Sequence, residues 1–137
     1  MIWVRQDQDV PDLSLFTLLV REYDEAIDWY RRALGFEVVE DTPQGDKRWV
    51  VVQASGQPGS RMLFARADTA AQRARVGDQT GGRVLLFFET DRFERDHARM
   101  VDAGVHFVEE PRHEPYGVVA VFEDLYGNRC DLIQPAR

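Results

Sequence analysis

Two stretches of this chain repeat each other at a nearly constant interval. Residues 35–41 read GFEVVED and residues 104–110 read GVHFVEE, an offset of 69, and a helical pattern precedes each stretch. Residues 59–64 (GSRMLF) and 127–132 (GNRCDL) match at an offset of 68. The two halves therefore correspond almost to their ends, which indicates an internal duplication. Two copies of a small β-rich unit set face to face are expected to form a cleft between them.

The first half is predicted to contain one helix and four strands. The run 13–20 (LSLFTLLV) is short and almost wholly apolar, which is typical of a strand covered on both faces. From Glu22 onward apolar residues recur at helical spacing, and Gly35 ends the predicted helix. Three more strands are predicted at 36–41, 48–54 and 61–66, separated by turn-rich segments. The predicted order is βαβββ.

The second half is predicted to repeat this order after a connector. Residues 67–82 lose the strand pattern and end in two glycines, so we expect a connector with one or two helical turns. A strand at 84–88, a helix at 92–103 and strands at 105–110, 117–123 and 129–134 follow. We expect a single domain over 1–137, made of module one at 12–66, a connector at 67–82 and module two at 83–135.

Composition argues against several kinds of partner. The formal net charge of −7 and the pI of about 4.9 disfavour nucleic acid and anionic membranes, because both would be repelled. No apolar run approaches the roughly 20 residues that span a bilayer, and the first residues lack the long apolar stretch of a signal peptide. The single cysteine, Cys130, forbids an intrachain disulfide. These features predict a cytoplasmic protein.

Several motifs resemble those of the vicinal oxygen chelate superfamily. Residues 20–26 (VREYDEA) lead into 29–30 (WY) and 34–36 (LGF), and DLYGN stands at 124–128. The resemblance covers about residues 12–135 and implies an α+β fold of two tandem βαβββ modules that form a cleft. The superfamily contains glyoxalase I, extradiol dioxygenases, fosfomycin-resistance enzymes and bleomycin-binding proteins. Because its members commonly dimerise, the resemblance also implies a homodimer.

Metal-dependent members of that superfamily take their ligands from the first and fourth strands of each module. The family pattern puts these positions at Leu15, Leu63, Val84 and Asp131. Three of the four side chains are aliphatic, and one carboxylate cannot repay the dehydration of a divalent ion. We therefore predict no metal and no other cofactor at this site. Glyoxalase I, dioxygenase and fosfomycin-thiol transferase activities all depend on the ion, so the departure argues against each of them.

Strand alternation predicts that the cleft is lined mainly by apolar side chains. The predicted ligand-binding residues on strands are Leu15, Thr17, Trp49, Leu63, Val84, Leu86, Phe88 and Asp131. Asp131 allows two interpretations. In one, it is a lone carboxylate in an apolar cavity, where it acts as a base or holds a cationic group of a ligand. In the other, Arg129 or another cation neutralises it.

The segment before the strand at 117–123 supplies further polar candidates. Arg112, His113, Glu114 and Tyr116 are predicted to form a polar rim over the cleft, although two prolines nearby are equally consistent with a plain connection. Of the other histidines, His97 falls beside the apolar stripe of its helix, which favours packing. A substitute metal site built from His106, His113 and a glutamate would match no recognised ligand spacing.

Two main functions follow from this reading. The first is a protein that binds a small, largely apolar or aromatic and sometimes cationic molecule between its modules without the usual metal. The second is a glyoxalase-like lyase or isomerase that uses Asp131, His113 or Tyr116 as acid or base, or that binds a metal through unusual ligands. A third hypothesis is a sensor or subunit whose cleft is vestigial.

Overall fold

The computed structural model describes residues 10–54 and 59–137 and contains two β-sheets, called here sheet A and sheet B. Sheet A has the strand order β1-β4-β3-β2. Its strands are β1 (Leu15–Val20), β2 (Phe36–Gln44), β3 (Lys47–Ala54) and β4 (Arg61–Arg66), with helix α1 (Tyr23–Leu34) between β1 and β2 in the chain. β1 pairs with β4 in parallel, whereas the other neighbours are antiparallel.

Sheet B repeats this arrangement in the second half of the chain. Its order is β5-β9-β8-β6, and β7 pairs with β8 outside this path. The elements are β5 (Leu86–Glu89), α3 (Phe93–Asp102), β6 (His106–Phe107), β7 (Arg112–Glu114), β8 (Gly117–Glu123) and β9 (Arg129–Pro135). The first strand again pairs in parallel with the last, and the last pairs antiparallel with the strand before it. The α+β fold of two tandem units is confirmed.

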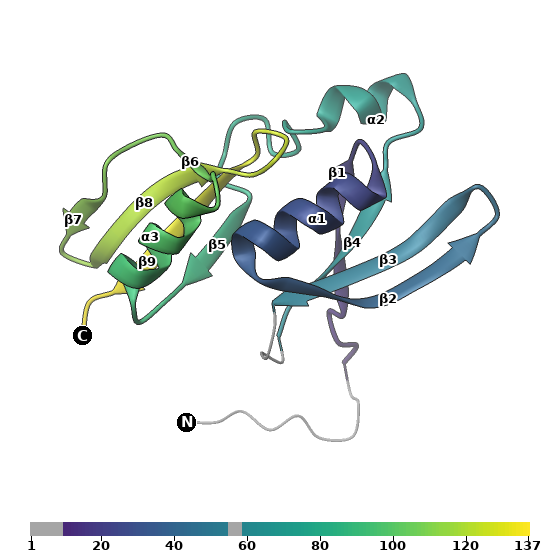
Figure 1. Cartoon of the computed structure of the whole chain (residues 1–137). Coiled ribbons are helices and arrows are strands. Elements are labelled where there is room, and N and C mark those ends of the chain that lie inside the picture. Colours follow the sequence, from purple (N-terminus) through teal and green to yellow (C-terminus); the bar gives the residue numbers. More distant parts are fainter. Residues whose placement is uncertain (1–9, 55–58) are drawn as a thin grey trace.

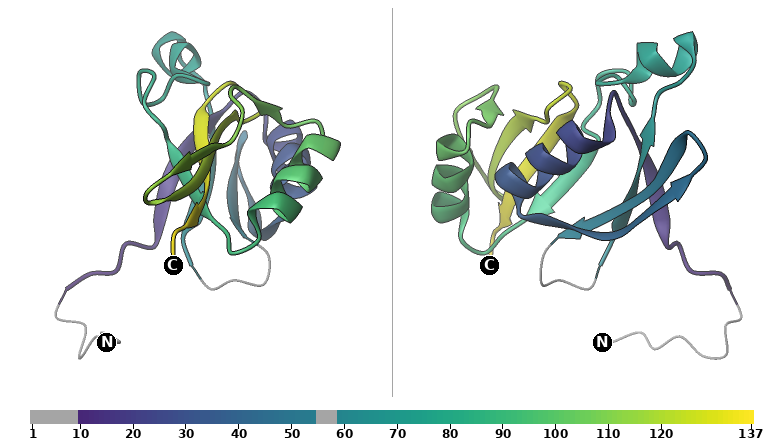
Figure 2. Two further views of the ribbon diagram at one scale, coloured as in Figure 1. Left: turned by 90° about the vertical axis from the view of Figure 1, so that its left-hand side faces the viewer. Right: turned by 45° about the vertical axis from the view of Figure 1, so that its right-hand side comes forward.

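Both long helices lie on the same side of the two sheets (Figure 1). The side view in Figure 2 shows α1 and α3 together on one side, while neither covers the opposite surface of the strands. Helix α2 (Ala70–Arg75), in the segment that connects the sheets, lies past one end of them. The surface opposite α1 and α3 is called here the helix-free face.

One hydrophobic core joins the two sheets on the helix side. Tyr30 of α1 is fully buried and contacts the rings of Phe36 and Phe64 edge-on, with ring centroids 5.4 Å apart in each pair. Phe36 then meets Phe88 of β5 at 6.1 Å, and Phe88 meets Phe122 of β8 at 5.9 Å. Because this row of rings crosses from sheet A to sheet B, the two halves are packed as one unit.

A buried carboxylate fixes α1 to the turn between β8 and β9. Asp124 is 5% exposed and accepts hydrogen bonds from the Tyr30 hydroxyl at 2.7 Å and from Asn128 Nδ2 at 2.9 Å. It also accepts from the backbone N–H groups of Tyr126 and Asn128, at 2.9 Å each. Burial, with the Asp124 charge beside it, raises the pKa of Tyr30 well above its usual value, so this hydroxyl remains a donor.

The connector packs against both halves. Gln79 follows the outer edge of β1: its Oε1 accepts from the Leu19 N–H at 2.9 Å, and its Nε2 donates to the Thr17 carbonyl at 2.7 Å. Gly77 approaches the backbone of Tyr126 so closely that an added Cβ would lie 2.0 Å from the carbonyl oxygen. Its φ of +80° is also one that side-chain-bearing residues rarely adopt.

The predicted elements differ from the observed ones mainly in sheet B. The strand predicted at 105–110 is reduced to the two residues of β6, and β7 forms where only a polar connection or rim was predicted. β5 begins at Leu86 rather than at Val84. The predicted helix end at Gly35 is confirmed, since this residue caps α1 with a φ of 71°.

Candidate functional site

Four of the predicted ligand residues lie on the helix-free face of sheet A. In the register of the sheet, Thr17 lies opposite Leu63, which lies opposite Val51, so these side chains point to the same side. Leu15 and Trp49 are two positions away on their strands and share that side. Val50 and Val52, which alternate with Val51, belong to the helix-side core. Strand alternation is therefore as predicted here, and ligand binding by these residues stays a prediction.

The indole of Trp49 is held in place on this face. Its Nε1 donates a hydrogen bond to Glu40 Oε2 at 2.7 Å. Val51 is only 1% exposed although it does not belong to the helix-side core. The middle of this face is apolar at Leu63 and Val51, and polar side chains such as Arg61 and Glu40 share the face around it. The ring of Trp49 adds a flat aromatic surface with a fixed polar edge.

The predicted orientation of β5 is wrong by one residue. Leu86 and Phe88 were expected in the cleft, but Leu86 belongs to the helix-side core and Phe88 packs against that core. The cause is pairing with β9, where Leu86 lies opposite the fully buried Cys130. The third predicted residue, Val84, precedes the first residue of the strand.

Phe87, which no sequence argument singled out, occupies the helix-free face instead. It lies opposite Asp131 in the register of sheet B, and Asp131 lies opposite Val121. The side chain of Phe87 is 68% exposed, which is unusual for a phenylalanine in a strand. An exposed aromatic ring beside a carboxylate is the most distinctive pair of side chains on this face.

Asp131 lies in this apolar setting without a full set of hydrogen-bond partners. Its Oδ1 is a buried side-chain oxygen with no hydrogen-bond partner among the described residues. Burial raises the pKa of Asp131 above its usual value, the charge of Arg112 opposes the rise, and that of Glu109 adds to it. No ion pair joins it to Arg129 within the described part of the chain, which favours the first of the two interpretations of this residue.

Arg112 is directed to the same face but is already neutralised. It lies opposite Val119 in the register of β7 and β8, and Val119 lies opposite Ile133 on the Asp131 side of the sheet. Its guanidinium pairs with Glu109 at 3.0 Å and Glu114 at 2.9 Å. Tyr116 is 54% exposed in the β7–β8 turn. The polar rim predicted from this segment is therefore present only in part.

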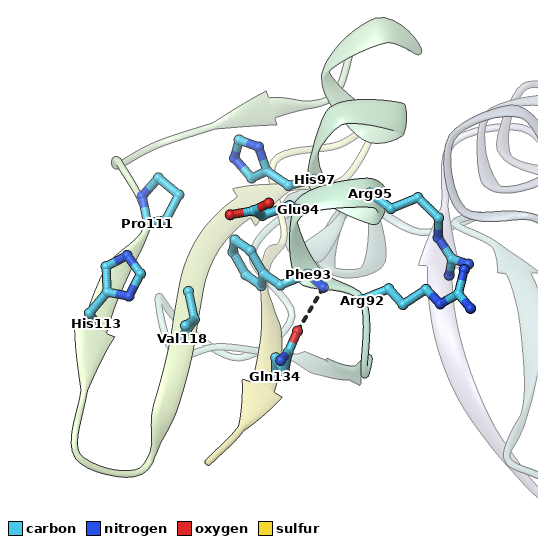
Figure 3. Close-up of a pocket in the computed structure, with 9 residues that line it drawn as sticks. All are labelled: Arg92, Phe93, Glu94, Arg95, His97, Pro111, His113, Val118 and Gln134. Carbon is cyan, nitrogen blue, oxygen red and sulfur yellow. Dashed lines mark hydrogen bonds between the residues drawn. The ribbon is translucent and has the colours of Figure 1, made fainter. Parts of the chain in front are cut away.

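His113 lies on the other side of sheet B. It is opposite Val118, which packs against the helix-side core, so the β8 strand separates it from Asp131. Figure 3 shows it with Pro111 and Val118 around a hollow of about 650 Å³ beside α3. His113 and Asp131 thus cannot act together on one small substrate bound to this chain.

Comparison with known proteins agrees with this geometry. A model of the Glyoxalase/Bleomycin resistance protein/Dioxygenase superfamily matches residues 13–132. The chain belongs to this superfamily. The resemblance seen in the sequence motifs is thereby confirmed.

Individual relatives span nearly the whole chain. It is 53% identical over 119 residues to an uncharacterized protein of Shewanella frigidimarina (strain NCIMB 400), covering 85% of this chain and 88% of that protein. Among solved structures, UcmS2 is 30% identical with a TM-score of 0.78 and covers 90% of this chain and 98% of its own. TnmS3, an antibiotic binding protein from Streptomyces sp. CB03234, is 26% identical with a TM-score of 0.74, and the match covers 93% of this chain and 98% of TnmS3.

The residues at the superfamily's usual metal site do not fit a divalent ion. Register places Leu15, Leu63 and Asp131 on the helix-free faces, whereas Val84, also aliphatic, precedes the first residue of β5. Within residues 10–54 and 59–137, no three His, Cys, Asp or Glu side chains are grouped so as to hold a metal. A single carboxylate cannot supply the donors that a resident metal needs.

The remaining histidines do not assemble a substitute metal site. His106 pairs with Glu123 at 2.9 Å on β6, whereas His113 lines the hollow beside α3. His97 packs between Phe93 and Phe107, with ring centroids 5.6 and 4.2 Å away, which agrees with the packing role expected for it. No helix in the described part of the chain is long and apolar enough to cross a membrane.

Proposed function

We propose that this protein binds a small, largely apolar or aromatic molecule against its helix-free faces, without the metal that enzymes of the superfamily use. The observation that carries the proposal is Asp131, a carboxylate with an unpartnered buried oxygen beside the exposed ring of Phe87. A ligand that places a cationic or hydrogen-bond-donating group at Asp131 and a flat apolar body on Phe87 satisfies both. The structural similarity to an antibiotic binding protein supports this class of ligand.

A homodimer is the second part of this proposal. The helix-free face of one chain exposes Phe87 and leaves Asp131 only partly buried, so a single copy surrounds a ligand poorly. A second copy whose sheet A faces sheet B of the first closes two equivalent clefts. Sedimentation equilibrium checks this, because the dimer has twice the mass of the 15.8 kDa chain; a monomer at all concentrations contradicts it.

A ligand screen with blocking variants tests the binding site. Planar aromatic molecules, each cationic probe paired with a neutral analogue, are titrated while the fluorescence of the protein is followed. Thr17→Trp fills the face of sheet A and is expected to weaken binding by roughly tenfold or more. Val101→Trp, at a residue 50% exposed on α3, adds the same bulk on the opposite side and serves as the control.

The results of the screen separate the alternatives. Loss of binding in Thr17→Trp but not in Val101→Trp supports the helix-free face as the site. Equal affinity in both variants rejects it. A preference for cationic probes that disappears in Asp131→Asn identifies Asp131 as the polar contact.

The raised pKa of Asp131 favours one enzymatic alternative, in which this residue acts alone as a general base in a lyase or isomerase reaction. His113 is then not its partner, because β8 lies between them. If this alternative holds, Asp131→Asn abolishes turnover of the identified ligand while its dissociation constant changes little. Binding without any turnover by the wild-type protein rejects it.

A further inference from the structure

A second cavity lies where the two halves of the chain meet, near the start of α1. Its volume is about 560 Å³. Four segments line it: the residues before α1, the end of β4, helix α2 and the turn between β8 and β9. The residues that line it include Arg21, Glu22, Arg66, Arg73, Leu125 and Tyr126. The cavity shares β4 with the helix-free face, but none of the residues that line it is one of the predicted ligand residues on that face.

The charge of this cavity is opposite to that of the whole protein. Three arginines and one glutamate line it, although the chain carries a formal net charge of −7. Such a local concentration of cations in an acidic protein would be unfavourable through their mutual repulsion unless carboxylates or a bound anion offset it.

The carboxylates nearby offset the arginines only in part. Arg21 pairs with Glu25 at 3.3 Å, and Arg66 lies 3.9 Å from Glu22. Arg73, on α2, has no side-chain hydrogen bond or ion pair within the described part of the chain. At least one guanidinium at the cavity is therefore available to an incoming group.

Aromatic rings hold the other two arginines in place. The guanidinium of Arg66 lies over the ring of Tyr23 at 5.4 Å from its centroid and donates to the Asp46 carbonyl at 2.8 Å. That of Arg21 lies over the ring of Tyr126 at 5.2 Å. Stacked guanidiniums lose little freedom when they bind an oxyanion, and their planar donors match phosphate and carboxylate oxygens.

The wall of the cavity is partly apolar. Leu125 and Tyr126 line it from the β8–β9 turn, and Ala67 and Val76 line it from the connector. We propose that this cavity binds a small oxyanion, a phosphate monoester or a carboxylate, attached to an apolar body. The oxyanion contacts Arg73 and Arg66, and the apolar body rests on Leu125 and Val76.

Nuclear magnetic resonance of the full-length protein tests this site. Spectra that report the Nε–H groups of the arginines are recorded during titration with phenyl phosphate, benzoate, inorganic phosphate and phenol. Phenyl phosphate or benzoate is expected to shift the Arg66 and Arg73 signals, and phenol is not. The relative affinities of the two anions distinguish a phosphate site from a carboxylate site, and inorganic phosphate measures the contribution of the apolar body.

A pair of variants on the same helix isolates the contribution of Arg73. Arg73→Gln is expected to weaken binding by roughly tenfold, the loss typical of a charged hydrogen bond. Arg75→Gln removes the same charge from α2, but Arg75 does not line the cavity and faces Asp78 at 4.0 Å, so it serves as the control. Binding is also expected to weaken as salt is raised.

Three results would overturn the proposal: no shift with any anion at millimolar concentration, equal weakening in Arg73→Gln and Arg75→Gln, or shifts that map to other arginines. The outcome is separate from that of the proposed function. Thr17→Trp blocks the helix-free face and leaves the arginine cavity intact. Arg73→Gln weakens binding at the arginine cavity and leaves the helix-free face intact.

Discussion

Replacing Asp131 with asparagine is expected to stabilise the free protein at neutral pH. Burying a polar group without a partner costs roughly 1–3 kcal/mol, and more when the group is charged; asparagine keeps the polar group but removes the charge. Asp131 is only partly buried, and solvent screens the exposed part of the charge, so we take the low end, about 1 kcal/mol. For a chain of this size, that corresponds to a rise in melting temperature of about 3 °C.

The pH dependence gives this prediction a second, independent test. Because burial raises the pKa of Asp131, the folded protein binds this proton more tightly than the unfolded chain does. Below its unfolded pKa of about 3.9 the carboxyl is protonated in both states and does not lower the free energy of unfolding. As the pH rises through the raised pKa of the folded state, the free energy of unfolding falls. The gain in free energy of unfolding from Asp131→Asn should be largest at neutral pH and should disappear in acid.

Urea unfolding of both proteins, measured from neutral pH down to the acid limit of folding, provides the data. Asp41→Asn is the matched control, because Asp41 accepts from Arg48 Nη2 at 2.6 Å and this hydrogen bond lowers its pKa. That variant should be less stable than the wild type, with a difference that shrinks as the pH falls. If Asp131→Asn is also less stable at neutral pH, Asp131 has a partner in solution and the argument for its role is refuted.

Two further substitutions test how the halves are joined. Tyr30→Phe leaves the buried Asp124 without one of its four donors and should lower the free energy of unfolding by about 1.5–3 kcal/mol in urea titrations; no change would mean that another donor replaces the hydroxyl. Gly77→Ala would place a Cβ 2.0 Å from the carbonyl oxygen of Tyr126. Gly81→Ala is the control, because Gly81 has a similar positive φ but no atom within 4 Å of an added Cβ. Thermal unfolding should show a clearly larger loss for Gly77→Ala, with about 1 kcal/mol for the control, and equal losses would contradict the close approach.

The fold was predictable because its signals are local and repeated. Apolar runs, helical spacing from Glu22 and the glycine at position 35 identify the elements, and the duplication predicts that the second half repeats them. The register of β5 was not predictable in this way. The segment 84–88 is apolar throughout, so its own pattern does not say which residues face the helix. Pairing with Cys130 and Leu132 of β9 decides it.

The candidate site was predicted in part for the same reason. Leu15, Thr17, Trp49 and Leu63 fall on strands whose register follows from sequence, whereas Phe87 depends on a long-range pairing. A signal for the shift did exist. The helix after β1 begins at Tyr23 and the helix after β5 at Phe93, an offset of 70 instead of 69. Counting strand positions from these apolar helix starts, rather than from the acidic residues, would have located Phe87.

The internal duplication also provides a control for the meaning of Asp131. Its counterpart in sheet A is Leu63, which has the same place in the last strand of its sheet and lies between Thr17 and Val51 as Asp131 lies between Phe87 and Val121. An aliphatic side chain therefore meets every requirement of the fold at this position. A carboxylate with an unpartnered oxygen is less favourable there, and this difference between the two sheets supports the proposal that Asp131 contacts a bound molecule.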